Sequence, residues 1–459
     1  MPSVEERLQR AAVTLDAAID EAVASAPSRA DGTQLSYRLP PGRDRRRFTV
    51  ALVSAAAIVA GVVGVAVVAG PNSDRPEPND VPVIPVERLE PNTWTPFPPP
   101  PIEPRFQYVA VATDSGVFVW GGCCTDSPAG DFFRDGAYFD AASGSWRVLP
   151  ESPLDPDRGD AIAAWTGAEV VVLNGNDGIQ AAAFDPAAFS WRALTAPSGD
   201  NATSGSSELF ALPDGRIAFV IAIYDDGLRN GVHVQIYDPS ADQWTAAAGP
   251  RAELSYGVAV PASVLGVATS DANVGVLSVI GPDCSTLSLD TYSTTADSWT
   301  TTPIGTTDWH RSDIAGIDGG RFLLSGGTRC STDEPDPRAL IVDPSTGSVD
   351  PAADVPIPLV RGVLEGIWTG QWAIRLNGDG RPLAYDPAGD RWLVGASVLD
   401  ASGAAADTVI WQTPVVWFDG QLVIASPGYE RADTDGSGGM CCFPEREAWT
   451  YRFVPDADG

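Results

Sequence analysis

The chain has 459 residues, with 60 Asp and Glu against 29 basic residues, all of them Arg, and a formal net charge of −31. A chain this acidic cannot neutralise phosphates, which excludes nucleic acid as a partner and an anionic membrane surface as a docking site for most of the protein. The hydrophobic content of 44% excludes a disordered polyacid, and the length fits either two or three ordinary domains or one large repeat array.

The first segment, residues 1–47, predicts a short amphipathic helix. Ser3 and Glu6 form a capping-box pattern that starts a helix, and Pro27 stops it, so we expect the helix over residues 4–24. Its apolar stripe has members three and four residues apart: Val4, Leu8, Ala11, Leu15, Ile19 and Ala22. Such a stripe suits a helix that lies on a membrane or pairs with itself, and it also suits docking of a cytoplasmic partner.

An uncharged apolar segment follows at residues 48–70. Its 23 residues are long enough to cross a lipid bilayer as a helix. A cleavable signal peptide is the alternative, but the preceding 47 residues are far longer than a signal n-region. Four arginines between residues 43 and 47 flank one side, and Asp74 and Glu77 flank the other. We therefore expect a single-pass anchor in the cell membrane, with the N-terminus cytoplasmic and the rest of the chain extracytoplasmic.

The order of helix, arginine cluster and anchor resembles, loosely, the layout of bacterial single-pass anti-sigma-like membrane proteins, although no motif of that family is present. This resemblance implies a cytoplasmic partner for the helix at residues 4–24.

Residues 71–91 are rich in proline and predict an extended linker that lifts the next domain off the membrane. A second proline run covers residues 98–101. Between the two runs lies the short island 92–95, which contains Trp94 and does not resemble a linker.

The chain from residue 92 to residue 459 repeats. In six units an aromatic or apolar residue precedes Asp or Ser, a turn follows, and Trp or Val comes six residues after the Asp or Ser. The six pairs are Phe139 and Trp146, Phe184 and Trp191, Tyr237 and Trp244, Tyr292 and Trp299, Val342 and Val349, and Tyr385 and Trp392. The Asp positions are separated by 45, 53, 55, 50 and 43 residues. A period near 50 without helical patterning predicts an all-β propeller of four-stranded blades.

Before these pairs lie apolar runs that end in small residues, such as 117–122 and 322–327, which both end in Gly-Gly. Here the chain resembles the kelch family, whose blades carry four apolar residues, a Gly-Gly doublet, and then an aromatic residue and a Trp at this spacing. The doublet is complete only in the first and fifth units, so the repeats are degenerate. The resemblance covers roughly residues 92–458 and implies a propeller of bacterial extracytoplasmic type.

Seven blades are expected, because three more strands follow the sixth unit, around residues 415–418, 421–425 and 449–453. The outer, Trp-bearing strand of this last blade is missing at the C-terminal side. Trp94 lies 52 residues before Trp146, in step with the repeat, and should supply that strand from the N-terminal side. A ring closed in this way removes sheet edges.

The cysteines each follow the second strand of a repeat unit: Cys123, Cys124, Cys284, Cys330, Cys441 and Cys442. The two vicinal pairs fall in the first and seventh units, which are neighbours in a closed ring. Cys284 and Cys330 take matching positions in units four and five. An even number in an oxidising compartment predicts disulfides, so we expect Cys284 to pair with Cys330 and one or two bridges to join the vicinal pairs. Metal binding by the vicinal pairs is the alternative.

Catalytic signatures are scarce, and we expect no catalytic residue and no cofactor. The copper-radical sugar oxidases among kelch-like propellers need two His, two Tyr and a cross-linked Cys, whereas His233 and His310 here fall in non-adjacent units. Asp433, Asp435 and Ser437 resemble the first half of a calcium loop. Pro444 stands where the bidentate Glu belongs, which favours a solvated acidic loop over calcium.

One face of the propeller carries the second-to-third strand loops together with the blade-to-blade connections. We name it the loop face, and we expect a ligand there on an acidic rim with an aromatic side chain for stacking. The candidates are Asp131, Asp135, Trp309, Arg311, Asp333 and Glu334. The same residues also fit loops that are merely solvated.

The favoured function is a membrane-tethered binding or sensing module for a glycan, a wall component or a protein. The alternative is an extracytoplasmic carbohydrate-active enzyme of oxidase or glycosidase type, because propeller loops can hold carboxylate pairs that sequence spacing does not reveal.

Overall fold

The structure is a computed structural model. The chain falls into two units, residues 1–33 and 34–459, and every described residue belongs to the second unit. The structure describes residues 92–123, 132–155, 161–174, 179–198, 207–225, 229–247, 262–280, 286–305, 309–329, 334–357, 366–404, 408–410, 413–432, 440–444 and 447–453. The expected helix at 4–24, the apolar segment at 48–70 and the linker at 71–91 lie outside them. Within these ranges, no helix has the length and apolar character needed to cross a membrane.

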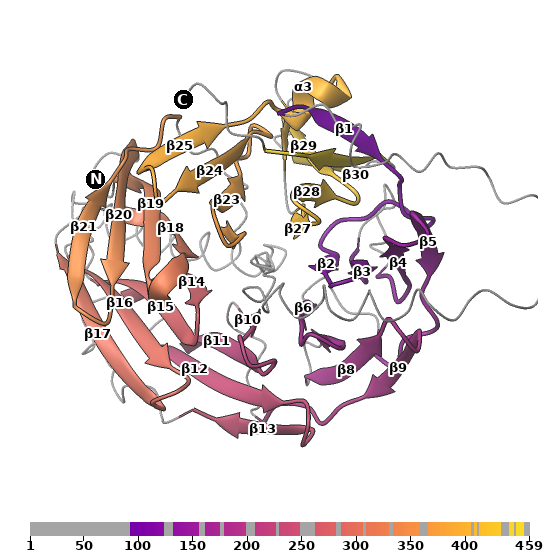
Figure 1. Ribbon diagram of the computed structural model, residues 1–459, viewed down its shortest axis with the longest axis horizontal. Helices are drawn as coiled ribbons and strands as arrows, with labels where there is room; N and C mark the ends of the chain where they lie inside the picture. The colour runs from indigo at the N-terminus through magenta and orange to yellow at the C-terminus, as the bar shows by residue number, and fades with distance from the viewer. Residues whose placement is uncertain are drawn as a thin grey trace, which may run out of the picture. The chain divides into compact units, whose positions relative to one another are not determined.

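Seven four-stranded antiparallel sheets, the blades, follow one another around a ring (Figure 1). Blades 1 and 2 consist of β2 (Val109–Ala112), β3 (Gly116–Trp120), β4 (Gly136–Asp140) and β5 (Ser145–Val148), then β6 (Ile162–Trp165), β7 (Val170–Asn174), β8 (Gln180–Asp185) and β9 (Ser190–Ala193). Blades 3 and 4 consist of β10 (Ser207–Ala211), β11 (Ile217–Asp225), β12 (Arg229–Asp238) and β13 (Gln243–Ala246), then β14 (Ala262–Ser270), β15 (Asn273–Ile280), β16 (Thr286–Ser293) and β17 (Ser298–Gly305).

The remaining blades include the shortest inner strand of the ring and the strand from the N-terminal side. Blades 5 and 6 consist of β18 (Trp309–Gly316), β19 (Phe322–Arg329), β20 (Pro335–Asp343) and β21 (Ser348–Ala352), then β22 (Ile367–Trp368), β23 (Ala373–Leu376), β24 (Pro382–Asp386) and β25 (Arg391–Val394). Blade 7 consists of β27 (Val416–Phe418), β28 (Gln421–Ile424), β31 (Ala448–Tyr451) and β1 (Trp94–Phe97). The prediction of a seven-bladed, all-β propeller is confirmed.

The ring is sealed in blade 7, where strands from both sides of the repeat array pair. β1 lies antiparallel to β31, with Trp94 opposite Tyr451 and their ring centroids 5.1 Å apart. In Figure 1 the indigo β1 accordingly lies among the yellow elements of the C-terminal side. The closure expected from the position of Trp94 is therefore confirmed, and Tyr451 with Trp94 forms the seventh pair of the repeat, which like five of the other six is aromatic.

The hydrophobic core lies between the blades. In β7, Val170 and Val172 pack in a cluster with blade 1, whereas Val171 packs in a cluster with blade 3. Side chains alternate between the two faces of a strand, so a strand covered on both faces is apolar throughout, as the sequence of β7 is. Similar clusters join each blade to the next, and the first one spans blades 7, 1 and 2. The apolar contacts therefore run around the whole ring.

The outer strand of a blade is fixed to the connection that follows the preceding blade. Each aromatic residue of the repeat lies opposite its Trp, as Tyr385 does with Trp392 at a centroid distance of 5.1 Å. The indole Nε1 of Trp392 then donates a hydrogen bond to the Ala353 carbonyl oxygen at 2.8 Å. The same bond runs from Trp94 to Ala396, from Trp146 to Pro98, from Trp191 to Pro150 and from Trp244 to Thr195. The Trp of the repeat thus joins neighbouring blades.

The repeat turn carries a second link in the units that have Tyr. The Tyr385 hydroxyl donates to Asp390 Oδ1 at 2.7 Å, and the same oxygen accepts from the Ala353 amide at 2.8 Å. Asp390 has a φ of +44°, in the left-handed region. Where the aromatic position has no hydroxyl, as at Val342, the equivalent turn position is Gly347. In the units with Tyr, the Asp at this position is bonded to the Tyr hydroxyl. Blade 2 has Phe189 there instead, at a φ of +52° and packed on Phe184.

Additional elements lie around blades 6 and 7. The helix α3 (Val398–Ser402) follows blade 6, with Ser397 as its N-cap and Gly403 in the left-handed conformation after it. A three-stranded sheet is formed by β26 (Thr408–Ile410), β29 (Gly428–Ala432) and β30 (Met440–Pro444). A short 3-10 helix, η2 (Asp318–Gly320), lies in the turn between β18 and β19. The repeat pattern does not predict any of these elements.

Candidate functional site

The expected loop-face residues do not assemble into one site among the residues that the structure describes. Asp135, Trp309 and Glu334 are described with their side chains. Asp131 and Asp333 lie outside the described residues, as does the side chain of Arg311. Glu334 is exposed, and its carbonyl oxygen accepts a hydrogen bond from the Arg329 amide at 2.9 Å.

Trp309 is not available for stacking on a ligand, so this part of the prediction is wrong. Its side chain is fully buried, at 0% exposure, in the apolar cluster between blades 4 and 5. Trp309 is the first residue of β18 and pairs with Arg329 of β19. The sequence suggested a connection here, but the strand begins earlier than expected and the alternation of the pleat turns the indole inward.

Asp135 is held by a buried cation rather than offered to a ligand. Arg105, at 1% exposure, donates from Nη1 to Asp135 Oδ1 at 2.6 Å and to the Gly121 carbonyl oxygen at 3.2 Å. Its Nε donates to the Glu103 carbonyl oxygen at 2.8 Å, and its guanidinium lies 4.0 Å from the ring centroid of Phe133. This arrangement holds the segment that leads into blade 1 in place, so the role of Asp135 is structural.

A buried carboxylate lies at the loop-face end of blade 5. The side chain of Asp336 is 0% exposed and accepts from Arg338 Nη2 at 2.5 Å and from the Arg338 amide at 3.1 Å. Arg329 Nε lies 3.4 Å from it. Burial acts to raise the pKa of Asp336, but the hydrogen bonds from Arg338 outweigh it and hold that pKa well below its usual range.

The metal and disulfide candidates fall largely outside the described side chains. The segment with Asp433, Asp435 and Ser437 lies outside the described residues, as do Cys124, Cys284 and Cys330 and the side chains of Cys441 and Cys442. Across the described part of the chain there is no group of three His, Cys, Asp or Glu side chains placed to hold a metal ion. The backbone of β30 places Cys441 opposite Arg431 and Cys442 opposite Glu430. The disulfide pairing stays a prediction.

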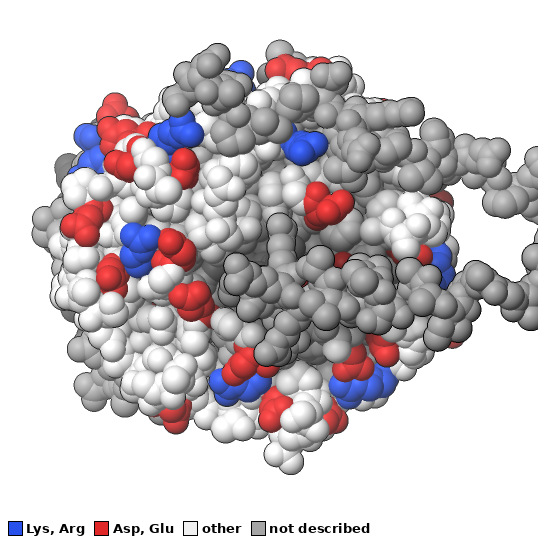
Figure 2. Space-filling view, viewed as in Figure 1, with Lys and Arg blue, Asp and Glu red and all other residues white. Residues whose placement is uncertain are grey.

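Charge is mixed on the face that Figure 2 shows. Acidic side chains of the described residues are spread around the ring, and arginines lie between them. Among the described residues, exposed ion pairs include Arg321 with Asp318 at 2.6 Å and Arg134 with Asp155 at 2.6 Å. Exposed pairs of this kind contribute little to stability.

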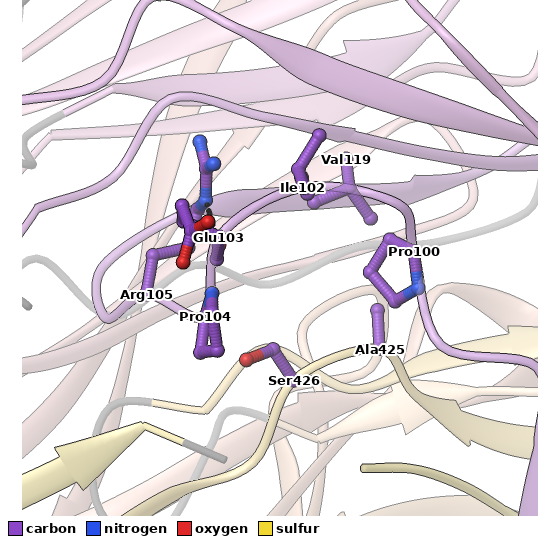
Figure 3. A pocket seen from close by; sticks show the side chains of 8 residues that line it. All are labelled: Pro100, Ile102, Glu103, Pro104, Arg105, Val119, Ala425 and Ser426. Carbon is purple, nitrogen blue, oxygen red and sulfur yellow. Dashed lines mark hydrogen bonds between the residues drawn. The ribbon is translucent and has the colours of Figure 1, made fainter. Parts of the chain in front are cut away.

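A small cleft crosses the seam between blades 7 and 1 (Figure 3). It is lined by the segment that leads from β1 into blade 1, by β3 and by the end of β28: Pro100, Ile102, Glu103, Pro104, Arg105, Val119, Ala425 and Ser426. Across this seam the Tyr108 hydroxyl donates to the Ser426 carbonyl oxygen at 3.0 Å and accepts from the Ser426 amide at 3.1 Å. The guanidinium of Arg105 already has the partners described above, so this cleft is part of the closure.

A second cleft lies between blades 5 and 6 and contains an ion pair between a buried arginine and a half-buried aspartate. Arg375 of β23 is 4% exposed, and its Nη1 lies 2.5 Å from Oδ2 of Asp313 of β18, which is 29% exposed. The cleft is lined by Asp313, Ile314, Ala315, Leu323, Ser325, Gly366, Ala373, Ile374, Arg375 and Trp392. The Arg375 guanidinium lies 5.7 Å from the ring centroid of Trp392.

The pKa values of the two partners are shifted in opposite directions from those of the free side chains. Burial raises the pKa of Asp313, and the nearby Arg375 counteracts that change. Burial lowers the pKa of Arg375, and Asp313 counteracts that change. For both groups, burial changes the pKa more than the charge of the partner does.

Sequence reasoning did not single out Arg375 or Asp313. One signal was present, because Arg375 is the only charged residue within the otherwise apolar run 372–376 of a core strand. Lys and Arg are almost never fully buried without a partner, so such a position calls for a carboxylate on a neighbouring blade. The sequence does not show which carboxylate pairs with Arg375, because this depends on how the blades pack in the ring.

No protein-family model matches the chain, and no curated protein matches it. Among solved structures, the chain is similar to one described as "Structure of YjhT", with 14% identical residues, a TM-score of 0.39, and coverage of 69% of this chain and 97% of that chain. The seven-bladed ring is therefore assigned from its own strand pairing.

Proposed function

We propose that the protein is a membrane-tethered, extracytoplasmic binding or sensing module, in which a kelch-like propeller presents its loop face to a glycan, a wall component or a protein. The tether is supported by the uncharged segment at 48–70, by the arginines before it and by the proline-rich linker after it. The kelch-like assignment is supported by the aromatic pairs of six blades and by the Gly-Gly doublets of blades 1 and 5.

The binding part of this proposal rests on one observation, the buried guanidinium of Arg375 in the cleft between blades 5 and 6. A preformed cleft in which a rigid scaffold fixes a few polar groups suits recognition of a ligand. The carboxylate in this cleft, Asp313, is already bound to Arg375. That arrangement offers hydrogen-bond donors to a ligand and does not resemble the separated carboxylate pair of a glycosidase.

The direct test is binding without turnover. The full chain in detergent micelles is applied to a glycan array and is sedimented with purified cell-wall sacculi. We expect retention on one of these surfaces and no change in the bound glycan. Release of hydrogen peroxide or cleavage of a glycan would instead support the alternative, a carbohydrate-active enzyme. Absence of retention on both surfaces would contradict a glycan or wall ligand.

The sensing part requires a cytoplasmic partner for the helix at residues 4–24. Used as bait in intact cells, this segment should retain the same partner as the full chain does. If removal of residues 4–24 leaves every phenotype of the full chain unchanged, the protein is an anchored binding module without a signalling role.

An oxidising compartment also predicts the disulfide pattern. Peptide mapping without reductant should find Cys284 joined to Cys330, and should link the pair Cys123 and Cys124 to the pair Cys441 and Cys442. Free thiols at all six positions would contradict the pairing and would weaken the extracytoplasmic assignment.

A further inference from the structure

The two edges of the Arg375 guanidinium differ in their hydrogen bonding. Its Nη1 is bound to Asp313, whereas Nε and Nη2 are buried and have no hydrogen-bond partner among the residues that the structure describes. A buried donor without a partner costs about 1–3 kcal/mol, and more when the group is charged. The Nε and Nη2 hydrogens form a planar fork that can hold one or two acceptor oxygens. The cleft therefore contains two buried nitrogen donors that oxygen acceptors of a ligand can bind.

The side chain is too well fixed to satisfy these donors by moving. The ion pair with Asp313 holds it from blade 5, and Trp392 lies beside the guanidinium from the outer strand of blade 6. Beside Arg375 the inner strand of blade 6 is short, because β22 has only two residues. Gly366 precedes β22 and lines the cleft, and a Cβ there would come within 2.4 Å of Ala315 Cβ. Close packing of blades 5 and 6 at this point keeps the fork in place.

The space in front of the fork limits what can enter. The cleft has room for about one water molecule. A ligand can therefore insert a single hydroxyl or carbonyl oxygen, while the rest of the ligand stays outside the cleft. The wall beside the fork combines the Trp392 ring with the buried Ser325. A wall that presents an aromatic ring and a hydroxyl next to fixed donors suits a sugar or an amide, which have both apolar and polar surface.

The charge balance decides between a neutral and an anionic acceptor. Asp313 already compensates the positive charge of Arg375, so a ligand carboxylate would leave one net negative charge in a buried site. The chain as a whole carries a net charge of −31, which repels anions at long range. The uncompensated charge in the site and the long-range repulsion both disfavour a carboxylate ligand and favour a neutral acceptor.

We infer that the Nε and Nη2 fork of Arg375 binds a neutral oxygen acceptor, a hydroxyl or an amide carbonyl of a neutral sugar. The inference rests on the proposed binding function and names the ligand class for its cleft. Asp313 acts as the selectivity residue, because its charge rejects carboxylates.

The test uses the full chain in detergent micelles with two probes, neutral N-acetylglucosamine and anionic glucuronate, followed by titration calorimetry. The wild-type chain should bind the neutral probe at least tenfold more tightly than glucuronate. Arg375→Lys keeps a positive charge near Asp313 but lacks the fork, so it should lose at least tenfold in affinity for the neutral probe. Asp313→Asn removes the compensating charge and should shift the preference towards glucuronate by about tenfold.

A control and a fold check accompany these variants. Arg381→Lys changes an arginine in the same blade whose side chain is 45% exposed, and it should bind as the wild type does. Melting temperatures show which variants remain folded, and Asp313→Asn tests the selectivity independently of Arg375→Lys. Unchanged binding by Arg375→Lys, a wild-type preference for glucuronate, or no binding of either probe would overturn the inference. Retention of both wild type and Arg375→Lys on sacculi would leave the binding function standing and refute only the role of Arg375.

Discussion

Asp336 shows at the residue scale how a single buried carboxylate can make stability depend on pH. Its pKa is depressed in the folded protein, because the hydrogen bonds from Arg338 outweigh the effect of burial. Its contribution is therefore present above the unfolded pKa, near 4, and is lost as the pH falls from there towards the folded pKa. We expect Asp336→Asn to lower the free energy of unfolding at pH 7 by about 1–3 kcal/mol and to flatten its decrease at acidic pH. Chemical denaturation at a series of pH values measures both effects.

The control for this prediction is Asp318→Asn, which changes an exposed ion pair and should change the free energy of unfolding by less than about 1 kcal/mol. An equal loss in both variants would contradict the role given to the burial of Asp336.

Asp390 tests the second feature at this scale, a side chain held in the left-handed conformation by a Tyr hydroxyl. Asp390→Ala should destabilise more than Asp390→Gly by about 1 kcal/mol, because both variants lose the bonds to Tyr385 and Ala353 but only Ala keeps the strained φ. The midpoint of denaturant unfolding gives this difference. At Gly347, where no hydroxyl is present, Gly347→Ala should show the strain alone. Equal losses for the two Asp390 variants would show that the conformation carries no strain.

The buried residues divide into those that the repeat predicts and those that it does not. The aromatic and Trp positions recur in nearly every unit, so their pairing followed from spacing. Asp313 and Arg375 are 62 residues apart and belong to different units, so their contact depends on how two blades pack. Trp309 was expected on the surface because it was assigned to a connection between blades, yet the strand register turns it into the core.

At the scale of elements, β1 carries the closure of the ring, and Trp94 is its main contact. Trp94 is 7% exposed, packs on Tyr451 and donates to the Ala396 carbonyl oxygen. Trp94→Ala should cost about 3–5 kcal/mol and lower the melting temperature by several degrees. Trp94→Phe keeps the ring contact and loses only the hydrogen bond, so it should cost about 1 kcal/mol. Removal of residues 92–95 should have at least the effect of Trp94→Ala, and an unchanged melting curve for this deletion would contradict closure by β1.

The strands of the blades were largely predictable, but the added elements were not. The strands around residues 416–418, 421–424 and 448–451 were expected from apolar runs in step with the repeat. β26, β29 and β30 are short, and β26 pairs with β29 from a different connection. No local periodicity marks such a pairing, because its stabilisation comes from contacts between distant segments. The same limit applies to α3, whose five residues are too few for a helical pattern to be recognised.

For the whole molecule, the proposed topology places the ring outside the cell. Protease added to intact cells should degrade the propeller and leave a tag at the N-terminus protected, because the arginines before residue 48 favour a cytoplasmic N-terminus. Immunoblots for both ends check this outcome. Permeabilised cells provide the control, in which both ends should be degraded. Loss of the tag in intact cells, or a mature chain that starts near residue 70, would refute the anchor.

The seam in blade 7 also sets the order in which the chain can complete its fold during synthesis. β1 is made early, but its partner β31 ends at Tyr451, so Trp94 waits for its pairing until residue 451 has left the ribosome. Contacts of such wide sequence separation form late and slowly. A prematurely terminated chain would expose the edge of β28 and the unpaired β1, and it would be recognisable to proteases and chaperones as unfinished. The strand that seals the ring therefore also marks whether the chain has been made through residue 451.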